Sequence, residues 1–174
     1  RGPGLLADLA AGPLGRGRVA CGGLGQIFQH STNHPGIVGH GLAMAYRVGA
    51  RLIDLEYVQF HPTVFYGKNA PRFLITEALR GEGAELVNID GKRFMDSVHE
   101  RGSLAPRDIV SRSIHDEMAN SGEPCVYLDL SGLDRERLPD RFPTVYRSCL
   151  EHGVDITREA IPVVPAAHYS CGGV

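Results

Sequence analysis

The sequence predicts an α+β fold. Short segments with the two-residue alternation of strands stand among segments whose apolar residues recur at helical spacing. The two kinds do not follow one another in the regular rhythm of a doubly wound parallel sheet. The chain has 174 residues, and a chain of that size buries roughly two-thirds of its unfolded surface. We therefore expect one domain, or one domain and a piece of another.

Two elements are expected in the first third of the chain. Val19 to Gly25 reads as the end of a strand that runs into a glycine-rich turn, where missing side chains let the backbone approach another group closely. Residues 37–49 predict a helix, with Gly49 as its C-terminal cap. Gly39 and Gly41 at its start would suit a phosphate or flavin edge at the positive helix end, and an ordinary tight turn explains them about equally well.

The rest of the chain predicts alternating short strands and helices. Residues 51–58 alternate as a strand, and residues 86–94 indicate a hairpin centred on Asp90-Gly91. Pro106 suits the first position of a helix in which apolar residues recur every four residues. The last third predicts a strand, a helix that stops at Gly153 and a final extended segment, at residues 126–130, 143–152 and 163–168.

Composition excludes several classes of function. The formal net charge of -2 offers no electrostatic footprint for nucleic acid or anionic lipid. No apolar run approaches the roughly 18 residues of a membrane span, and Gly12 and Pro13 interrupt the apolar stretch that a signal peptide needs. The four cysteines are scattered, which favours reduced thiols and a cytoplasmic setting.

Three nearby histidines raise the question of a metal site. His30 and His34 have the spacing of two ligands on one helix face, and His40 follows. However, Asn33 and Pro35 argue against a helix there, and no cysteine or carboxylate follows at ligand spacing. We therefore expect no metal ion.

Two histidines and an arginine are the first candidates for chemistry. His61 precedes Pro62, whose ring biases the His61 backbone to an extended conformation and so aims the imidazole. His168 follows a small-residue run, and either histidine can donate hydrogen bonds to an anionic ligand. Arg107 lies in the first turn of the helix that Pro106 opens, where a cation opposes the helix dipole. Its guanidinium anchors a substrate carboxylate, donates a proton beside one, or forms a salt bridge with Asp108, Glu100 or another carboxylate.

A second candidate cluster lies between these motifs. Glu77 and Arg80 are three residues apart beside a glycine-flanked turn, so a carboxylate and a guanidinium can meet there. The pair can pass protons or serve as an ordinary ion pair. Thr76 supplies a hydroxyl on the same segment. Together with the histidines, these residues suggest a pocket for a doubly negative small molecule.

Five motifs follow one another along the chain: Gln59-Phe60-His61-Pro62-Thr63, residues 76–84, Arg93-Phe94-Met95, residues 104–110 and Pro165-Ala166-Ala167-His168-Tyr169. Together they resemble one known family. It is the flavoprotein family of succinate dehydrogenase, fumarate reductase and L-aspartate oxidase, and the resemblance covers about residues 20–174 in order. Within that family the amino-acid sequences of the Arg107 and His168 motifs are most similar to those of the L-aspartate oxidase branch.

The resemblance implies a reaction and a cofactor. FAD would take a hydride from C2 of L-aspartate to give iminoaspartate, the first step of NAD biosynthesis, with oxygen or fumarate as electron acceptor. The family pattern implies that His61, Thr76 and His168 hold the dicarboxylate, whereas Arg107 lies at the reacting carbon. Glu77 and Arg80 match proton-relay positions of fumarate reductases, and an arginine is better suited to electrostatic stabilisation than to acid–base catalysis. The glycines expected at the cofactor are Gly22, Gly23, Gly25, Gly39 and Gly41.

The resemblance also implies a domain arrangement. The chain would be the central part of such a protein, namely its substrate-capping domain with flanking pieces of the FAD-binding domain. The expected divisions are residues 1–54, 55–165 and 166–174. The family usually has Thr at the position of Cys21 and Asp at that of His40. Two alternatives are a fumarate reductase or succinate dehydrogenase segment and a non-catalytic dicarboxylate-binding domain.

Overall fold

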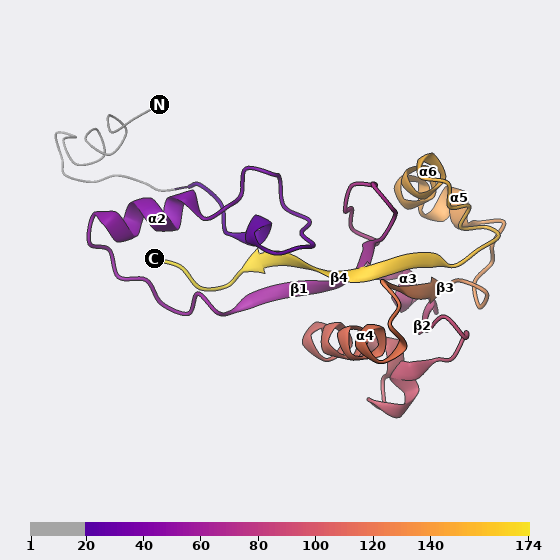
Figure 1. Ribbon diagram of the computed structural model, residues 1–174. Helices are drawn as coiled ribbons and strands as arrows, with labels where there is room; N and C mark the ends of the chain where they lie inside the picture. The colour runs from indigo at the N-terminus through magenta and orange to yellow at the C-terminus, as the bar shows by residue number, and fades with distance from the viewer. Residues whose placement is uncertain (1–19) are drawn as a thin grey trace.

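A four-stranded antiparallel sheet organises the molecule. The computed structural model describes residues 20–174, and the part of the predicted first strand at Val19 and the segment around Gly12 and Pro13 lie outside them. The strands are β1 (Val58–Phe65), β2 (Glu85–Val87), β3 (Val126–Asp129) and β4 (Ile161–Ser170), in the order β1-β4-β3-β2. Figure 1 shows β1 and β4 as a long ribbon through the middle of the molecule.

Helices lie around both ends of this ribbon. In Figure 1, α2 (His40–Arg47) is near one end, whereas β2, β3, α5 (Leu138–Arg141) and α6 (Pro143–Glu151) are at the other. The helix α4 (Arg107–Ser121) runs beside β1. The remaining short helices are α3 (Ala78–Gly81) and the 3₁₀ turns η1 (Gly25–Ile27), η2 (Phe94–Ser97) and η3 (Gly102–Leu104). The predicted mixture of helices and strands is thus confirmed.

Several predicted elements are confirmed with small shifts. The helix expected at residues 37–49 is α2, and Gly49 has a φ of 84°. Pro106 is the N-cap of α4 rather than its first helical residue, and Gly122 ends that helix in the left-handed conformation. The strand at 126–130, the helix at 143–152 and the extended segment at 163–168 appear as β3, α6 and β4.

Three predicted elements are wrong. Residues 51–57 form turns and a single bridge at Ile53, because Asp54 adopts a φ of 55° that no strand tolerates. The sequence Asp90-Gly91 does turn the chain, but the residues after it form η2 instead of a second strand, so β2 pairs with β3. The residues from Ala20 to Leu24 form no strand, and η1 follows them.

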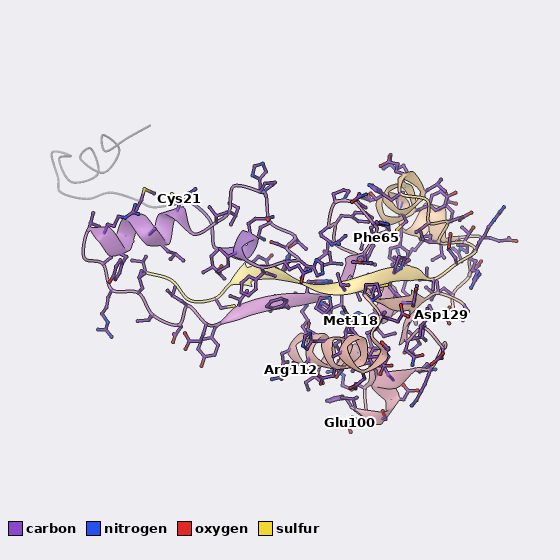
Figure 2. All side chains as sticks on the ribbon, viewed as in Figure 1. Cys21, Phe65, Glu100, Arg112, Met118 and Asp129 are labelled. Atoms are coloured by element: carbon purple, nitrogen blue, oxygen red, sulfur yellow. The ribbon has the colours of Figure 1, made fainter. Side chains whose placement is uncertain are left out.

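One apolar core lies at the β2–β3 end of the sheet. Figure 2 shows side chains gathered most densely where Phe65 and Asp129 lie, and more sparsely around α2 and Cys21. The core draws fully buried residues from every strand and from α4 and α6, among them Phe65, Leu86, Ile114, Leu128, Cys149 and Ile161. Because β1 and β4 both contribute side chains to this core, packing against the core holds one end of the β1–β4 ribbon in place. Among the described residues, no helix is long and apolar enough to cross a membrane.

Candidate active site

Two irregularities in the ribbon set the directions of His61 and His168. Gln59 pairs with Tyr169 and Phe60 with Ala167, so His168 is the extra residue of a bulge in β4. Such a bulge re-aims the side chain of its extra residue. A second irregularity follows His61, where Pro62 has no N–H to give to the ladder. The two rings meet edge to face with their centroids 5.6 Å apart.

The backbone also fixes the proton position on His61. This side chain is only 1% exposed, and its Nδ1 accepts a hydrogen bond of 3.3 Å from the backbone N–H of Thr63. A backbone N–H can only donate, so the ring proton of neutral His61 is on Nε2. Burial, together with the charges of Arg107 and Arg80, lowers the pKa of His61 to about 4. At neutral pH, His61 is therefore an uncharged Nε2–H donor.

Arg107 and Glu77 form the charged part of the site. Arg107 Nε and Nη2 donate to Glu77 Oε2 at 3.0 and 2.6 Å, and Nη1 donates to Gln59 Oε1 at 3.2 Å. The hydrogen bond from Arg107 is the main reason that the pKa of Glu77 is lowered. The salt bridge considered for Arg107 is present, and its partner is another carboxylate, Glu77, rather than Asp108 or Glu100. Asp108 pairs with Arg112 instead.

Arg80 is the most unusual residue of the cluster. It is 1% exposed, its Nη1 donates to the Ser103 carbonyl at 2.6 Å, and its Nη2 lies 3.5 Å from Glu77 Oε1. Its Nε and Nη2 have no hydrogen-bond partner among the described residues. The Ser103 hydroxyl in turn donates to Glu85 Oε2 at 2.6 Å. One carboxylate thus stands between two guanidinium groups, so these three side chains carry a net charge of about +1.

The structure brings together most of the residues predicted for the site. His61, Glu77, Arg80, Arg107 and His168 influence one another electrostatically, and burial and the charge of Arg107 lower the pKa of His168. Thr76 directly precedes Glu77, and its hydroxyl accepts the N–H of Ala78 at 3.3 Å. Three polar partners were not assigned to the site from the sequence: Gln59, Ser103 and Thr32. Gln59 stands in the same motif as His61, whereas Ser103 and Thr32 lie outside the motifs.

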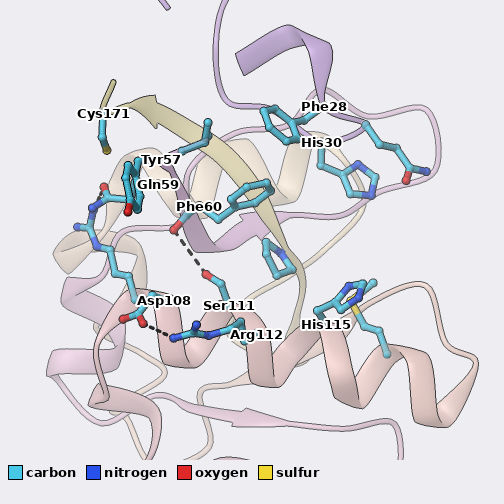
Figure 3. Close-up of a pocket in the computed structure, with 15 residues that line it drawn as sticks. Phe28, His30, Tyr57, Gln59, Phe60, Asp108, Ser111, Arg112, His115 and Cys171 are labelled. Carbon is cyan, nitrogen blue, oxygen red and sulfur yellow. Dashed lines mark hydrogen bonds and ion pairs between the residues drawn. The ribbon is translucent and has the colours of Figure 1, made fainter. Parts of the chain in front are cut away.

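A cavity of about 950 Å³ lies beside this cluster, between α4, β1 and the segment at residues 28–30. Figure 3 shows Phe28, Phe60 and His115 around it, with the Ser111 hydroxyl bonded to the Phe60 carbonyl. Arg107 and Gln59 line its edge, but His61, Glu77 and His168 do not. The cavity therefore adjoins the candidate site and does not contain it.

The glycines of the predicted cofactor turn have neighbours within the chain itself. A Cβ on Gly23 would lie 2.3 Å from Ser170 Oγ, and one on Gly25 would lie 2.2 Å from Asn33 Oδ1. Gly22 has a φ of 72°, which favours glycine. The close approach predicted for this turn is therefore an approach of the chain's own side chains, and contact of these glycines with a cofactor is still a prediction.

Gly25→Ala should destabilise the chain by about 1–3 kcal/mol, because Asn33 must withdraw from the added methyl group. Gly81→Ala is the matched control, since a Cβ there meets nothing within 4 Å. Urea unfolding of both variants measures the difference. Equal stability of the two variants would contradict the packing role of Gly25.

The start of α2 offers a place for an anionic group. Gly39, with a φ of 83°, is its N-cap, no side chain caps it and no acidic residue lies in its first turn. The first N–H groups of a helix have no partner within the helix and attract anions. Gly41 is buried in that first turn. These residues fit a negatively charged portion of a nucleotide cofactor. Among the described residues, no group of three or more His, Cys, Asp or Glu side chains could hold a metal ion.

Comparison with known proteins places this chain in a family. The family model described as "FAD binding domain" matches residues 18–174, and the chain belongs to that family. FAD, the cofactor predicted from the motifs, is therefore the cofactor of the family.

Individual relatives are more specific. The chain is 54% identical to the L-aspartate oxidase of Pseudomonas aeruginosa and 53% identical to L-aspartate oxidase 1 of Ralstonia nicotianae, each over 156 residues. These matches cover 90% of this chain and 29% of each relative. Among solved structures, a quinol-fumarate reductase is similar with a TM-score of 0.78 and 36% identity, over 89% of this chain and 30% of that one. The resemblance drawn from the motifs is confirmed.

Proposed function

We propose that this chain is the substrate-capping part of an FAD-dependent L-aspartate oxidase. The observation that carries the proposal is the cluster of two neutral histidines beside the Arg107–Glu77–Arg80 triad, in a chain about half identical to L-aspartate oxidases. The chain spans 29% of the length of each of those relatives, and the activity is proposed for the whole protein. The proposed divisions are 1–54 and 166–174 for the FAD-binding domain and 55–165 for the cap.

The dicarboxylate would be held by donors of two kinds. His61 presents an uncharged Nε2–H, and Arg107 presents a planar guanidinium that is 34% exposed and so accessible to a ligand. His168 adds a second imidazole beside the first, and Thr76 adds a hydroxyl at the start of α3. Uncharged donors suit this position, because a charged imidazole next to two guanidinium groups would be disfavoured.

The proposed reaction is oxidation of L-aspartate to iminoaspartate, with oxygen or fumarate as electron acceptor. Bound FAD supplies the acceptor for the hydride that leaves C2, and the amino group loses a proton. Arg107 stabilises negative charge on the substrate near that carbon, since a guanidinium is a poor acid or base. Glu77 is the proposed relay for that proton, and the hydrogen bond from Arg107, which lowers the pKa of Glu77, means that it passes the proton on rather than retaining it. Gly39 and Gly41 at the α2 start, with the turn at Gly22, Gly23 and Gly25, would face FAD.

We further propose a reducing, cytoplasmic location. Cys125 and Cys149 are buried and unpaired, and Cys21 and Cys171 are exposed and unpaired. Four free thiols in one chain are typical of proteins in a reducing compartment.

A chimaera tests the proposed function. In the Pseudomonas aeruginosa L-aspartate oxidase, the matching 156 residues are replaced by those of this chain. The chimaera should retain the yellow flavin absorbance and reduce the flavin anaerobically when L-aspartate is added. Flavin binding without aspartate oxidation, but with succinate oxidation or fumarate reduction, would favour the respiratory alternative. Aspartate binding without any flavin reduction would favour a non-catalytic dicarboxylate domain.

A further inference from the structure

The segment Ser31–Asn33 lies against the bulge of β4 that carries His168. Ser31 forms a parallel bridge with Ala167, and the backbone N–H of Thr32 donates to the Ala167 carbonyl at 3.1 Å. Asn33 Nδ2 donates to the carbonyl of His168 at 2.9 Å. The extra residue of a bulge has no pairing partner on the neighbouring strand. The hydrogen bonds from Thr32 and Asn33 therefore hold the backbone at His168, where β1 offers no pairing partner.

Thr32 also touches the His168 ring. Its hydroxyl lies 2.7 Å from Nδ1 and 3.4 Å from the Ala167 carbonyl oxygen. That carbonyl already accepts the N–H of Thr32 at 3.1 Å and the hydroxyl of Ser31 at 3.4 Å. The Thr32 hydroxyl has one proton to donate, and Nδ1 of His168 is both closer than the Ala167 carbonyl and less occupied. Nδ1 is therefore the better acceptor for that proton.

We propose that Thr32 is a positioning residue that holds His168 as its Nε2–H tautomer. This inference rests on the proposed function and adds to it a residue that the sequence motifs did not single out. With the Thr32 hydroxyl donating to Nδ1, the ring proton is on Nε2, the nitrogen on the far side of the ring from Thr32. His61 is held in the same tautomer by the Thr63 N–H. The two histidines thus present matching N–H donors to a carboxylate.

The opposite tautomer would repel the substrate. If Nδ1 of His168 carried the proton and donated to Thr32, the Nε2 lone pair would face the carboxylate oxygens. A neutral histidine in water populates both tautomers, so a fixed hydroxyl partner is what selects one. Burial and Arg107 lower the pKa of His168, which keeps the ring uncharged and makes tautomer selection matter.

Asn33 and Gly25 extend this support to the glycine-rich turn. The Asn33 side chain fits against the backbone of Gly25, where a Cβ would lie 2.2 Å from its Oδ1. The same side chain holds the carbonyl of His168. The turn at the proposed flavin side therefore braces the segment that orients the substrate histidine.

Thr32→Val, which removes the hydroxyl at nearly constant shape, tests the proposal in the chimaera. We expect the KM for L-aspartate to rise about tenfold with flavin content unchanged, the effect of about one charge-assisted hydrogen bond. Thr32→Ser should restore most of the affinity. In ¹⁵N-histidine NMR, His168 should show a protonated Nε2 and an acceptor Nδ1, and the valine variant should show a mixture of tautomers.

Ser31→Ala is the matched control, because it alters the same segment without touching the ring. It should leave the His168 tautomer unchanged. The proposal is overturned if native His168 carries its proton on Nδ1, or if the valine variant keeps both the native KM and the native tautomer. The NMR experiment does not depend on turnover. Loss of aspartate oxidation in the chimaera with native Thr32 would therefore count against the proposed function alone.

Discussion

Replacing Arg107 with alanine in the chimaera should lower kcat for L-aspartate by about a hundredfold to a thousandfold, the usual loss when one donor to developing charge is removed. Arg107 is the first residue of α4, and its guanidinium is fixed by Glu77 and Gln59. Alanine removes the guanidinium that we propose as the carboxylate anchor and as the positive charge near the reacting carbon. Arg107→Lys should recover only part of the rate, since an ammonium group lacks the planar fork.

A second arginine on the same helix provides the control. Arg112 lies on the same helix, is 72% exposed and pairs with Asp108. Arg112→Ala should keep near-native kcat. Both variants should retain the flavin absorbance, because neither side chain belongs to the turn or helix start proposed for FAD. A normal rate in Arg107→Ala with flavin bound would contradict the role of Arg107.

The elements that the sequence predicted correctly are those defined by a strong local signal. The helix after Pro106 has a proline at its start and a four-residue apolar period, and the structure has a helix there, Arg107–Ser121. Residues 51–57 alternate like a strand, but Asp54 takes a positive φ and no neighbouring strand pairs along the segment. The turn at Asp90-Gly91 was recognised, but strand pairing is a non-local property, and β3 was the better partner for β2.

The site shows the same division between local and non-local information. The sequence His61-Pro62 indicates a backbone-aimed imidazole, and the structure places it in β1 beside an irregularity. The partner of Arg107 could not be predicted from spacing, because Glu77 lies 30 residues away. Thr32 carried no signal, since 136 residues separate its hydroxyl from the ring that it touches.

The pH dependence of folding should reveal His61 as a buried neutral histidine. Its pKa is lowered from 6.5 to about 4 in the folded chain. Between these values the unfolded state binds a proton that the folded state does not, so the free energy of unfolding falls as the pH falls. The full contribution is present above about pH 6.5, and a shift of this size corresponds to on the order of 3 kcal/mol lost by pH 4.

His61→Asn isolates that contribution. Asparagine keeps an acceptor for the Thr63 N–H but does not titrate. The comparison is between the slopes of the free energy of unfolding with pH, so a difference in overall stability between the variant and the native chain does not affect it. Urea unfolding between pH 7 and 4.5 should show that the free energy of unfolding falls less steeply for His61→Asn than for the native chain. The ionised carboxylates with lowered pKa values, such as Glu77, lose their contribution to the free energy of unfolding mainly below this pH range.

Identical slopes for His61→Asn and the native chain would mean that His61 already takes up its proton in the folded state. A charged imidazole would then lie beside Arg107 and Arg80, and the binding scheme based on two neutral N–H donors would fail.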